Sequence, residues 1–434
     1  MSVLKAWGGV GHSRAAHVLR LSDRFSNLPA DVTQVGLLAH GRGRSYGDVC
    51  LNHGGTLLHT AGLHRFISFD RAKGVLRCEA GVSLREILAL TVPQGWFLAV
   101  TPGTRDVTLG GGIANDVHGK NHHVAGSFGH HVLRLELLRS SGERLLCSPD
   151  MQPELFRATV GGLGLTGLIT WAEIQLIPIA NAYMEVETTR FANLDEFWAL
   201  NAHSETRWPY TVAWIDCLAR GKQQGRGVFM AGRHAAPQDS LPDWRERNRN
   251  VPFSPPVSLV NPLSLRAFNT LYWHKAKSGR SLSHYVPYFY PLDAISHWNR
   301  IYGRAGFYQY QCVLPPATMR EGMIALLETI ARSGQGSFLA VLKTFGQCAN
   351  IGLMSFPRPG ATLALDFPNR GETTLRLFRE LDAVVRDAQG ALYPAKDARM
   401  PAELFKSAFP QWAQFSQWID PAFSSDFWRR VTHE

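Results

Sequence analysis

The chain is 434 residues long, 45% of them apolar and 18% charged, with a formal net charge of +10. One hydrophobic core stops growing well below this length, so we expect two domains. No run of about 18 apolar residues and no apolar leader is present, which excludes a transmembrane helix and a secretory signal and predicts a cytoplasmic protein or one peripheral on the inner membrane.

The cysteines and the basic residues exclude further classes. Six cysteines are scattered without C-x-x-C spacing, which disfavours a disulfide framework or a zinc site and fits a reducing compartment. Lysines and arginines form no block, so nucleic acid is the least favoured partner. A phosphorylated substrate or an anionic membrane surface would explain the positive charge, as would an ordinary basic surface.

The first motif is GRGRSYGD at residues 41–48, directly after the apolar residues 35–39. Glycine amides and the guanidinium groups of Arg42 and Arg44 both donate hydrogen bonds to phosphate oxygens. The segment therefore fits a pyrophosphate cradle, although an exposed basic turn would have the same composition. A second glycine-rich segment about 60 residues later favours the cradle.

That second segment, residues 101–129, has seven glycines between Gly103 and Gly129. Glycine lets bare backbone N–H groups approach a ligand closely. The apolar residues among the glycines argue against a flexible linker, and no Gly-Lys-Ser/Thr ending marks a P-loop. We therefore predict a rigid loop that lies along a large, flat, partly anionic cofactor.

Five histidines, at positions 118, 122, 123, 130 and 131, follow these glycines or lie among them. His118 and His122 would share a helical face, but the surrounding glycines disfavour a helix and no H-E-x-x-H motif is present. We predict no metal. His118 is expected to face the cofactor or the substrate, with a structural hydrogen bond as the alternative.

Local patterns predict the elements around the motifs. Ser83 and Glu86 form a capping box that begins a helix, and apolar alternation marks the strands. The predicted helices are Leu84–Thr91, Pro153–Thr159, Leu194–His203, Met319–Arg332 and Glu372–Ala388. The predicted strands are 133–138, Arg144–Cys147, Leu168–Ile177, Tyr183–Thr189, Tyr210–Asp216, Phe307–Leu314, Ser337–Phe345 and Thr362–Phe367. Residues 236–281 are rich in Pro, Ser, Asn and Arg and predict a long, partly mobile excursion.

A literal G-x-G-x-x-G occurs at Gly162–Gly167. The Rossmann fingerprint needs a strand before it and a helix after it. Here the order is reversed, because a predicted helix precedes the glycines and a predicted strand follows them. We therefore reject a Rossmann site and expect these glycines to line a cofactor between helix and strand.

Polar side chains in the second half suggest a place for a substrate. Gln309 and Gln311 fall on one face of a predicted strand, and Lys343 lies on another. Such a face is usually solvated, but the aromatic neighbours make a sugar-binding floor reasonable. Lys396 would by default be a surface lysine paired with Asp397. No G-x-S-x-G and no phosphotransfer motif supports a hydrolase or a kinase.

Taken together, residues 41–48, 101–123 and ATVGGLGLTG at 158–167 resemble the vanillyl-alcohol-oxidase-type FAD-binding flavoproteins. DVHGKNHH, AGSFG, FYQYQ at 307–311, LKTFG at 342–346, LDFP at 365–368 and AKDAR at 395–399 look like the decaprenylphosphoryl-β-D-ribose 2-oxidase group. The likeness extends over nearly the whole chain, and the HGKNHH run is specific.

The resemblance implies an α+β, two-domain fold of the vanillyl-alcohol-oxidase type. An FAD-binding domain would comprise residues 1–180, completed by 390–434, and an antiparallel-sheet substrate domain would comprise 181–389. The implied reaction is FAD-dependent oxidation of the 2′-hydroxyl of a polyprenyl-phosphate-linked pentofuranose (ribose) to a ketone. A separate NAD(P)H-dependent short-chain reductase would complete an epimerisation to arabinose. No flavin-attachment motif is recognised, so we expect non-covalent FAD.

The resemblance also implies site residues. Catalytic roles fall on Tyr46, His118 and Lys396; positive charge from Lys396 would stabilise the reduced flavin, and the base lies with His118 or a Tyr46-linked network. The implied FAD contacts are Gly41, Arg42, Gly43, Arg44, Ser45, Tyr46, Pro102, Gly103, Thr104, Gly110, Gly111, Gly112, Asn115, His118, Gly119, Gly162, Gly164, Ile169, Tyr393 and Lys396. The implied substrate contacts are Lys120, Tyr290, Gln309, Gln311, Lys343, Phe345 and Asp366.

Three positions depart from the group. Arg is usual where this chain has His40, which changes one expected cofactor contact. Mycobacterial members have Asn and Cys where this chain has Thr362 and Ala364. Covalent inhibitors aimed at that cysteine are therefore expected to fail here.

Two other functions stay open. An FAD-dependent oxidase of a free sugar alcohol or an aldonolactone would use similar FAD loops. A non-catalytic flavin-binding module that senses redox state or docks a reductase would also contain them. The polar Gln309, Gln311, Lys343 and Lys396 favour catalysis over such a module.

Overall fold

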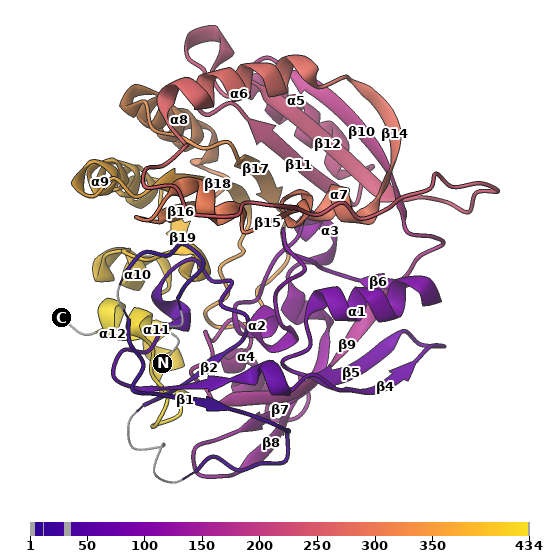
Figure 1. The fold of residues 1–434 in the computed structure, drawn as a ribbon, viewed down its shortest axis with the longest axis vertical. Coiled ribbons are helices and arrows are strands. Elements are labelled where there is room, and N and C mark those ends of the chain that lie inside the picture. The colour runs from indigo at the N-terminus through magenta and orange to yellow at the C-terminus, as the bar shows by residue number, and fades with distance from the viewer. Residues whose placement is uncertain (1–4, 12, 30–35, 433–434) are drawn as a thin grey trace.

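The structure, a computed structural model, describes residues 5–11, 13–29 and 36–432. Two large antiparallel sheets with their helices form most of it (Figure 1). The first sheet is built from residues 66–178 and the second from residues 183–392. The C-terminal helices, yellow in Figure 1, return to lie beside the N-terminal strands.

The first large sheet has six strands, with β9 (Leu168–Pro178) at its centre. The others are β4 (Phe66–Asp70), β5 (Val75–Glu79), β6 (Trp96–Leu98), β7 (Val132–Leu138) and β8 (Arg144–Cys147). Its helices are α1 (Leu84–Thr91), α2 (Leu109–Ala114), α3 (His122–Ala125) and α4 (Pro153–Thr159). Ile87, Ile113 and Phe156 join Ile174 of β9 in one buried apolar core, which fixes the glycine-rich segment around α2 against the sheet.

A small parallel sheet of N-terminal strands contacts the C-terminal part of the chain. It consists of β1 (His17–Arg20), β3 (Thr56–His59) and β2 (Leu37–His40), in that order. The helices α10 (Ala402–Ala408), α11 (Trp412–Ser416) and α12 (Asp426–Thr432) belong to the returning tail. The Leu37 amide donates to the Ala422 carbonyl at 2.6 Å, and Arg430 pairs with Asp48 at 2.8 Å.

The second large sheet has eight strands in the order β14-β10-β12-β11-β17-β18-β16-β19, all paired antiparallel. They are β10 (Tyr183–Phe191), β11 (Tyr210–Ile215), β12 (Gly227–His234), β14 (Gly279–His284), β16 (Phe307–Leu314), β17 (Ala340–Phe345), β18 (Gly360–Pro368) and β19 (Ala391–Leu392). One face packs on α5 (Leu194–Glu205), α8 (Met319–Ser333) and α9 (Glu372–Asp387). Alternate residues such as Lys343, next to the buried Leu342, lie on the other face.

Residues 236–281 contain more regular structure than their composition predicts. β13 (Arg249–Asn250) pairs in parallel with β15 (Ile295–Ser296), and α6 (Pro262–Lys275) begins at an Asn261 cap. α7 (Tyr285–Phe289) follows β14. The helix was missed because its apolar residues are not confined to one side: Leu265 is buried, whereas Leu263 and Leu271 are exposed, so the sequence shows no single apolar stripe.

Most predicted elements are confirmed. The capping box at Ser83 begins α1, Pro153–Thr159 is α4, and Phe307–Leu314 is β16. α4 precedes the G-x-G-x-x-G and β9 follows it, so the rejection of a Rossmann site is also correct. The prediction of a continuous loop over residues 101–129 is wrong, because Gly110, Gly111 and Gly112 lie in α2. Among the described residues, no helix is both long and apolar enough to cross a membrane.

Candidate functional site

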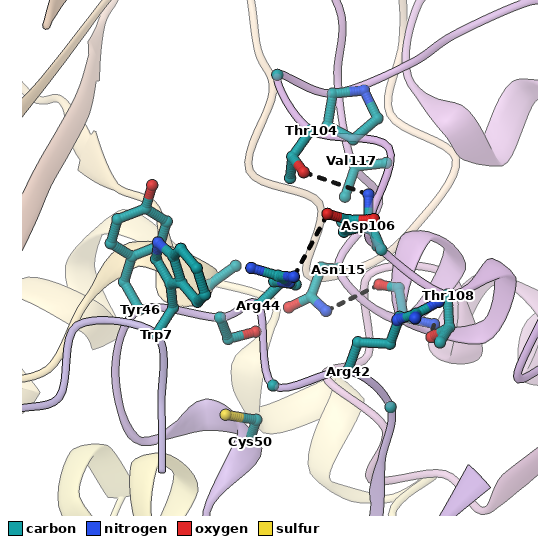
Figure 2. Close-up of a pocket in the computed structure, with 18 of the residues that line it drawn as sticks. Trp7, Arg42, Arg44, Tyr46, Cys50, Thr104, Asp106, Thr108, Asn115 and Val117 are labelled. Atoms are coloured by element: carbon teal, nitrogen blue, oxygen red, sulfur yellow. Dashed lines mark hydrogen bonds and ion pairs between the residues drawn. The ribbon is translucent and has the colours of Figure 1, made fainter. Parts of the chain in front are cut away.

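A cavity of about 590 Å³ lies where the glycine-rich segments of the first half meet the polar face of the second sheet. Its size and its mixture of apolar and polar walls are those of a cofactor or substrate site. Figure 2 shows part of the wall formed by the first half, with Trp7, Arg44 and Asp106 among the labelled residues.

The loop after β2 forms one wall through backbone and arginine side chains. The Arg44 guanidinium lies 4.2 Å above the Trp7 ring and pairs with Asp106 at 3.4 Å (Figure 2). The C-terminal tail packs directly against this loop: a Cβ on Gly47 would lie only 1.7 Å from the Asp397 carbonyl oxygen. Only glycine allows this close approach.

The helix α2 forms the adjoining wall. Thr108 caps it by accepting from the Gly111 amide at 3.1 Å. The Asn115 side chain donates to the Gly111 carbonyl at 2.9 Å, and the Tyr393 hydroxyl donates to the Asn115 carbonyl at 2.8 Å. Tyr393 thereby ties the C-terminal segment to the glycine-rich one.

His118 is at the junction of both halves. The Gln311 amide donates to His118 Nε2 at 3.0 Å and to Thr362 Oγ1 at 3.3 Å. His118 Nε2 is thus an acceptor, and the neutral ring carries its proton on Nδ1. Burial and the ammonium groups of Lys343 and Lys396 hold the pKa of His118 well below its ordinary value, so this neutral form is the one present near pH 7.

Two half-buried lysines near His118, Lys120 and Lys343, lack acidic partners within 4.0 Å among the described residues. Lys343 Nζ donates to the Gly119 carbonyl at 2.8 Å, and Lys120 Nζ donates to the Tyr288 carbonyl. Burial lowers the pKa of Lys120 to about 7, and burial with neighbouring ammonium charge lowers the pKa of Lys343 to about 7. Such shifts mean that the charged forms are poorly solvated by the protein itself.

Lys396 is the third half-buried lysine. The expectation that it would be a surface lysine paired with Asp397 is wrong. Asp397 pairs instead with Arg430 at 2.8 Å. Lys396 Nζ lies 3.9 Å from the centre of the Tyr46 ring. Burial lowers the pKa of Lys396, although the nearby Asp366 carboxylate opposes the shift.

Asp366 is completely buried and accepts from Gln309 at 2.7 Å. Burial raises the pKa of its carboxyl group, against the opposing effects of Gln309 and Lys396. Gln309 also acts on the Tyr46 hydroxyl, whose pKa burial raises well above its usual value. Tyr46, Gln309, Asp366 and Lys396 therefore form one connected polar group.

All ion pairs found within 4.0 Å among the residues that the structure describes use arginine, and none uses Lys120, Lys343 or Lys396. Lys343 and Lys396 on the cavity wall and Lys120 behind it make the site cationic, and only Lys396 has a carboxylate, that of Asp366, acting on it. An anionic ligand is the group that such a site stabilises best.

Most of the predicted site residues line this one cavity. They are Gly41, Arg42, Gly43, Arg44, Ser45, Tyr46, Pro102, Gly103, Thr104, Gly110, Gly111, Asn115, His118, Gly164, Ile169, Gln309, Gln311, Lys343, Tyr393 and Lys396. The structure therefore brings together segments more than 300 residues apart in the sequence, from Gly41 to Lys396.

Seven predicted contacts do not line the cavity: Gly112, Gly119, Gly162, Lys120, Tyr290, Phe345 and Asp366. The glycines face protein, as at Gly162, where a Cβ would lie 2.0 Å from the Ala158 carbonyl oxygen. Tyr290 is buried with its hydroxyl 2.6 Å from Thr101 Oγ1, and the Phe345 ring packs 4.8 Å from that of His118. The motifs marked these positions without separating direct contacts from the residues that support them.

The structure locates the three positions at which this chain departs from the decaprenylphosphoryl-β-D-ribose 2-oxidase group, His40, Thr362 and Ala364. Thr362 and Ala364 both line the cavity from β18. His40 is buried outside the cavity wall, with Nδ1 3.0 Å from the Cys50 carbonyl. The changes at 362 and 364 therefore alter the cavity surface directly, whereas the His40 side chain faces protein.

The remaining histidines and Asp116 have structural contacts. Asp116 accepts from the Gly129 amide at 2.8 Å and from Ser355 at 2.5 Å. His130 and His131 each contact a backbone carbonyl, at 3.0 and 2.9 Å. Within the described ranges no cluster of three or more His, Cys, Asp or Glu could hold a metal ion.

The sequence did not identify several residues of the wall. They are Trp7, Arg85, Asp106, Asn248, Asp293, Ser296, Trp298, Leu339 and Val341. Trp7 and residues 292–298 fall in segments without a motif, and no local pattern would have found them. Asp106 lies inside the conspicuous glycine-rich run and could have been weighed as a partner for Arg44.

The wall fits a large ligand with phosphate and ring portions. Arg44 Nε, Asn115 Oδ1 and His118 Nδ1 are buried and have no hydrogen-bond partner among the described residues. A Cβ placed on Gly103 would meet nothing within 4 Å, so its backbone is open to a ligand. Glycine amides and arginine suit a pyrophosphate, and the polar junction at His118 suits the reacting end of a cofactor.

Comparison with known proteins identifies that ligand. The FAD binding domain family matches residues 29–148, which contain the first two glycine-rich segments. Over 32% of this chain and 27% of its own length, delta(24)-sterol reductase of Homo sapiens is 30% identical. D-arabinono-1,4-lactone oxidase of Yarrowia lipolytica is 26% identical over 35% of this chain and 28% of its own length. The fold and the site define an FAD-dependent oxidoreductase.

A longer match gives the family. Decaprenylphosphoryl-beta-D-ribose oxidase of Mycolicibacterium smegmatis is 37% identical over 99% of this chain and 97% of its own length. The alignment includes both large sheets and the returning tail. The chain belongs to the decaprenylphosphoryl-β-D-ribose oxidase family.

Proposed function

We propose that this protein oxidises the 2′-hydroxyl of a polyprenyl-phosphate-linked ribofuranose to the 2′-keto sugar. The observation that carries the proposal is the cationic site around His118, where Lys343 and Lys396 line the same cavity as the glutamines of β16, and Lys120 lies behind the wall. A free polyol or lactone has no negative charge to stabilise these ammonium groups, whereas a sugar phosphate has one. The full-length similarity to a decaprenylphosphoryl-ribose oxidase supports the same substrate class.

The proposed arrangement assigns the two halves separate tasks. The first 180 residues and the returning tail would hold non-covalent FAD, and residues 181–389 would hold the sugar phosphate. FAD, when bound, supplies the electron acceptor for the carbinol C–H. Arg44 and the amides of residues 41–46 would bind its pyrophosphate, while Asn115, His118 and Tyr393 would position its ring.

The protein's own groups would handle the proton and the charge. His118 offers an N–H at Nδ1 rather than a lone pair, so we assign it as a hydrogen-bond donor to a ligand oxygen. The hydroxyl proton would then pass to the polar group of Tyr46, Gln309 and Asp366. Lys396 beside this group would contribute positive charge as electron density moves onto the cofactor.

Lys343 is the proposed phosphate ligand, because it lines the cavity and pairs in the sheet with Thr362, to which the Gln311 amide donates at 3.3 Å. Lys120 adds charge from behind the wall, where Tyr288 and Phe289 surround its ammonium group. Thr362 and Ala364 give this wall a smaller, less polar surface than Asn and Cys would. A partner short-chain reductase using NAD(P)H would complete conversion to the arabino sugar, with both enzymes working near a membrane surface.

Anaerobic reduction of the bound flavin tests this function. A short-chain prenyl-phosphoryl ribose should bleach the flavin absorbance, whereas free ribose, arabinitol and an aldonolactone should leave it unchanged. Equal bleaching by the free compounds would favour the aldonolactone or sugar-alcohol oxidase, whose relative is similar over 35% of this chain. Failure of every sugar compound to bleach it would favour a flavin module that docks a partner.

A further inference from the structure

The exposed apolar side chains of this protein concentrate in one segment. Phe253, Val257, Leu259, Leu263, Phe268, Leu271 and Tyr272 are all exposed, with Leu263 at 78% and Leu271 at 66%. We call this set the 253–272 surface. Exposed apolar residues are ordinary when scattered, but a concentration of this kind marks an interaction site.

The helix α6 carries much of this surface on a side that does not pack on the protein. Leu265 and Asn269 form its buried side, and Asn269 donates to Asp216 at 2.8 Å. Leu263 and Leu271 are two helical turns apart and therefore fall on a common outward stripe. α6 is thus fixed by one side while a second apolar stripe faces outward.

The charged residues of the segment that carries this surface are of one sign, and of them Arg280 pairs with Glu187 of the neighbouring strand β10 at 2.8 Å. Residues 247–292 contain six lysines and arginines and no aspartate or glutamate. Arg266, Lys275 and Lys277 are exposed on or beside α6. Apolar residues flanked by basic residues, without carboxylates, complement a bilayer surface with anionic headgroups. A protein partner would not by itself require a 46-residue segment free of acidic residues.

The 253–272 surface is continuous with the cavity wall. The Tyr272 ring lies 4.5 Å from that of Trp214, and Trp214 pairs across the sheet with Val341, which lines the cavity. The Phe268 ring lies 4.9 Å from that of Phe338, next to the lining residue Leu339. A lipid-linked substrate held in a bilayer at this surface would therefore lie beside the site.

We propose that the 253–272 surface docks the protein on an anionic membrane, with the Leu263 and Leu271 stripe entering the interface. The docking itself needs no catalysis, and it rests on the proposed function only in bringing a prenyl phosphate to the cavity. The FAD-loaded full chain should bind vesicles containing phosphatidylglycerol, more weakly at high salt, and should bind neutral phosphatidylcholine vesicles at least about tenfold less well.

Three variants separate the contributions. The Leu263→Ser/Leu271→Ser double variant should lose vesicle binding by at least about tenfold, because two apolar side chains no longer enter the interface. The Lys275→Glu/Lys277→Glu double variant should lose most of the salt-sensitive part of the vesicle binding. Ile324→Ser, at an exposed isoleucine of α8 outside this surface, should bind as the native protein does.

The outcomes are distinct from those of the catalytic proposal. Lys396→Met should bind vesicles normally even if it no longer reduces flavin, and the double serine variant should still oxidise a short-chain soluble substrate. Absence of native binding to anionic vesicles would overturn the docking proposal, as would equal binding by the double serine variant. It would also be overturned by sedimentation showing a native dimer that this variant converts to a monomer, since a second copy would then cover the surface.

Discussion

Lys343→Met should make the substrate-free protein more stable while removing its affinity for sugar phosphate. Lys343 is half-buried on β17 at the cavity wall, its Nζ donates to one carbonyl at 2.8 Å, and no carboxylate lies within 4.0 Å of it among the described residues. Methionine is of similar length and carries no charge. The substitution therefore removes a poorly solvated ammonium group without leaving a large cavity.

The magnitude follows from the lowered pKa. Each pKa unit corresponds to about 1.4 kcal/mol, so a fall from 10.5 to about 7 gives an ammonium cost of up to ~5 kcal/mol in the folded protein. Loss of the hydrogen bond to Gly119 offsets ~1 kcal/mol of the stability gained by removing the charge. We expect a net gain in the free energy of unfolding of about 2–4 kcal/mol near pH 7.

The pH dependence identifies the cause. Below pH 7 both the folded and the unfolded chain bind the Lys343 proton, so the full cost is present. Between pH 7 and 10.5 only the unfolded chain binds it, so native stability rises with pH and the cost disappears. The advantage of Lys343→Met should therefore be largest at pH 6.5–7 and smaller by ~2–3 kcal/mol at pH 9.

Urea unfolding of the FAD-loaded protein without substrate would measure this advantage at both pH values. Lys73→Met, at an exposed lysine, is the matched control and should change stability little at either pH. Two results would refute the account of a poorly solvated, unpaired charge. One is a Lys343→Met protein less stable than the native protein at pH 7, and the other is a stability advantage that is as large at pH 9 as at pH 7. Unchanged binding of a prenyl-phosphate analogue would refute the phosphate role.

Three further changes test other parts of the site. Lys396→Met should retain FAD but slow anaerobic flavin reduction by about 10²–10⁴-fold in stopped-flow measurements, and a native rate would remove it from the mechanism. Ala364→Cys should gain a thiol in the cavity wall that a maleimide modifies, as detected by mass spectrometry; protection by substrate is expected, and its absence would place residue 364 away from the bound sugar. Gly47→Ala should destabilise the fold by more than ~2 kcal/mol in urea, because its Cβ would lie 1.7 Å from the Asp397 carbonyl oxygen. Gly103→Ala, with open space around the added methyl, should not.

Elements with a local signal could be predicted from the sequence. Ser83 and Glu86 are three residues apart, and the cap that they form depends on nothing distant. The same holds for β16, where apolar alternation alone marks the strand. α2 could not be predicted in this way, because glycine lowers helix propensity. A tertiary contact accounts for glycine at position 110: the Gly110 amide donates to the Ala80 carbonyl at 2.8 Å, and an added Cβ would lie 3.0 Å from the Ala80 Cβ.

The site was predicted less completely than the fold, for a physical reason. Motifs identified the segments that meet, but the meeting depends on contacts between distant residues. Asp397 is adjacent to Lys396 in the sequence, yet its carboxylate is taken by Arg430 of α12. That pairing leaves Lys396 turned to Tyr46 and Asp366, an outcome that only the packed tail determines.

The same reasoning explains why lysine and arginine are used so differently in this chain. Every ion pair within 4.0 Å among the described residues uses an arginine, as in the Arg399–Asp382 and Arg430–Asp48 contacts that hold the tail in place. The lysines around the cavity have no carboxylate within 4.0 Å among the described residues, and Gln309 rather than Lys396 contacts the Asp366 carboxylate directly. A carboxylate beside each lysine would stabilise the substrate-free protein, but it would also compete with the phosphate for the same charge. The site therefore leaves part of its stability to be supplied by anionic ligands, and substrate binding should raise the resistance to unfolding as well as initiate the reaction.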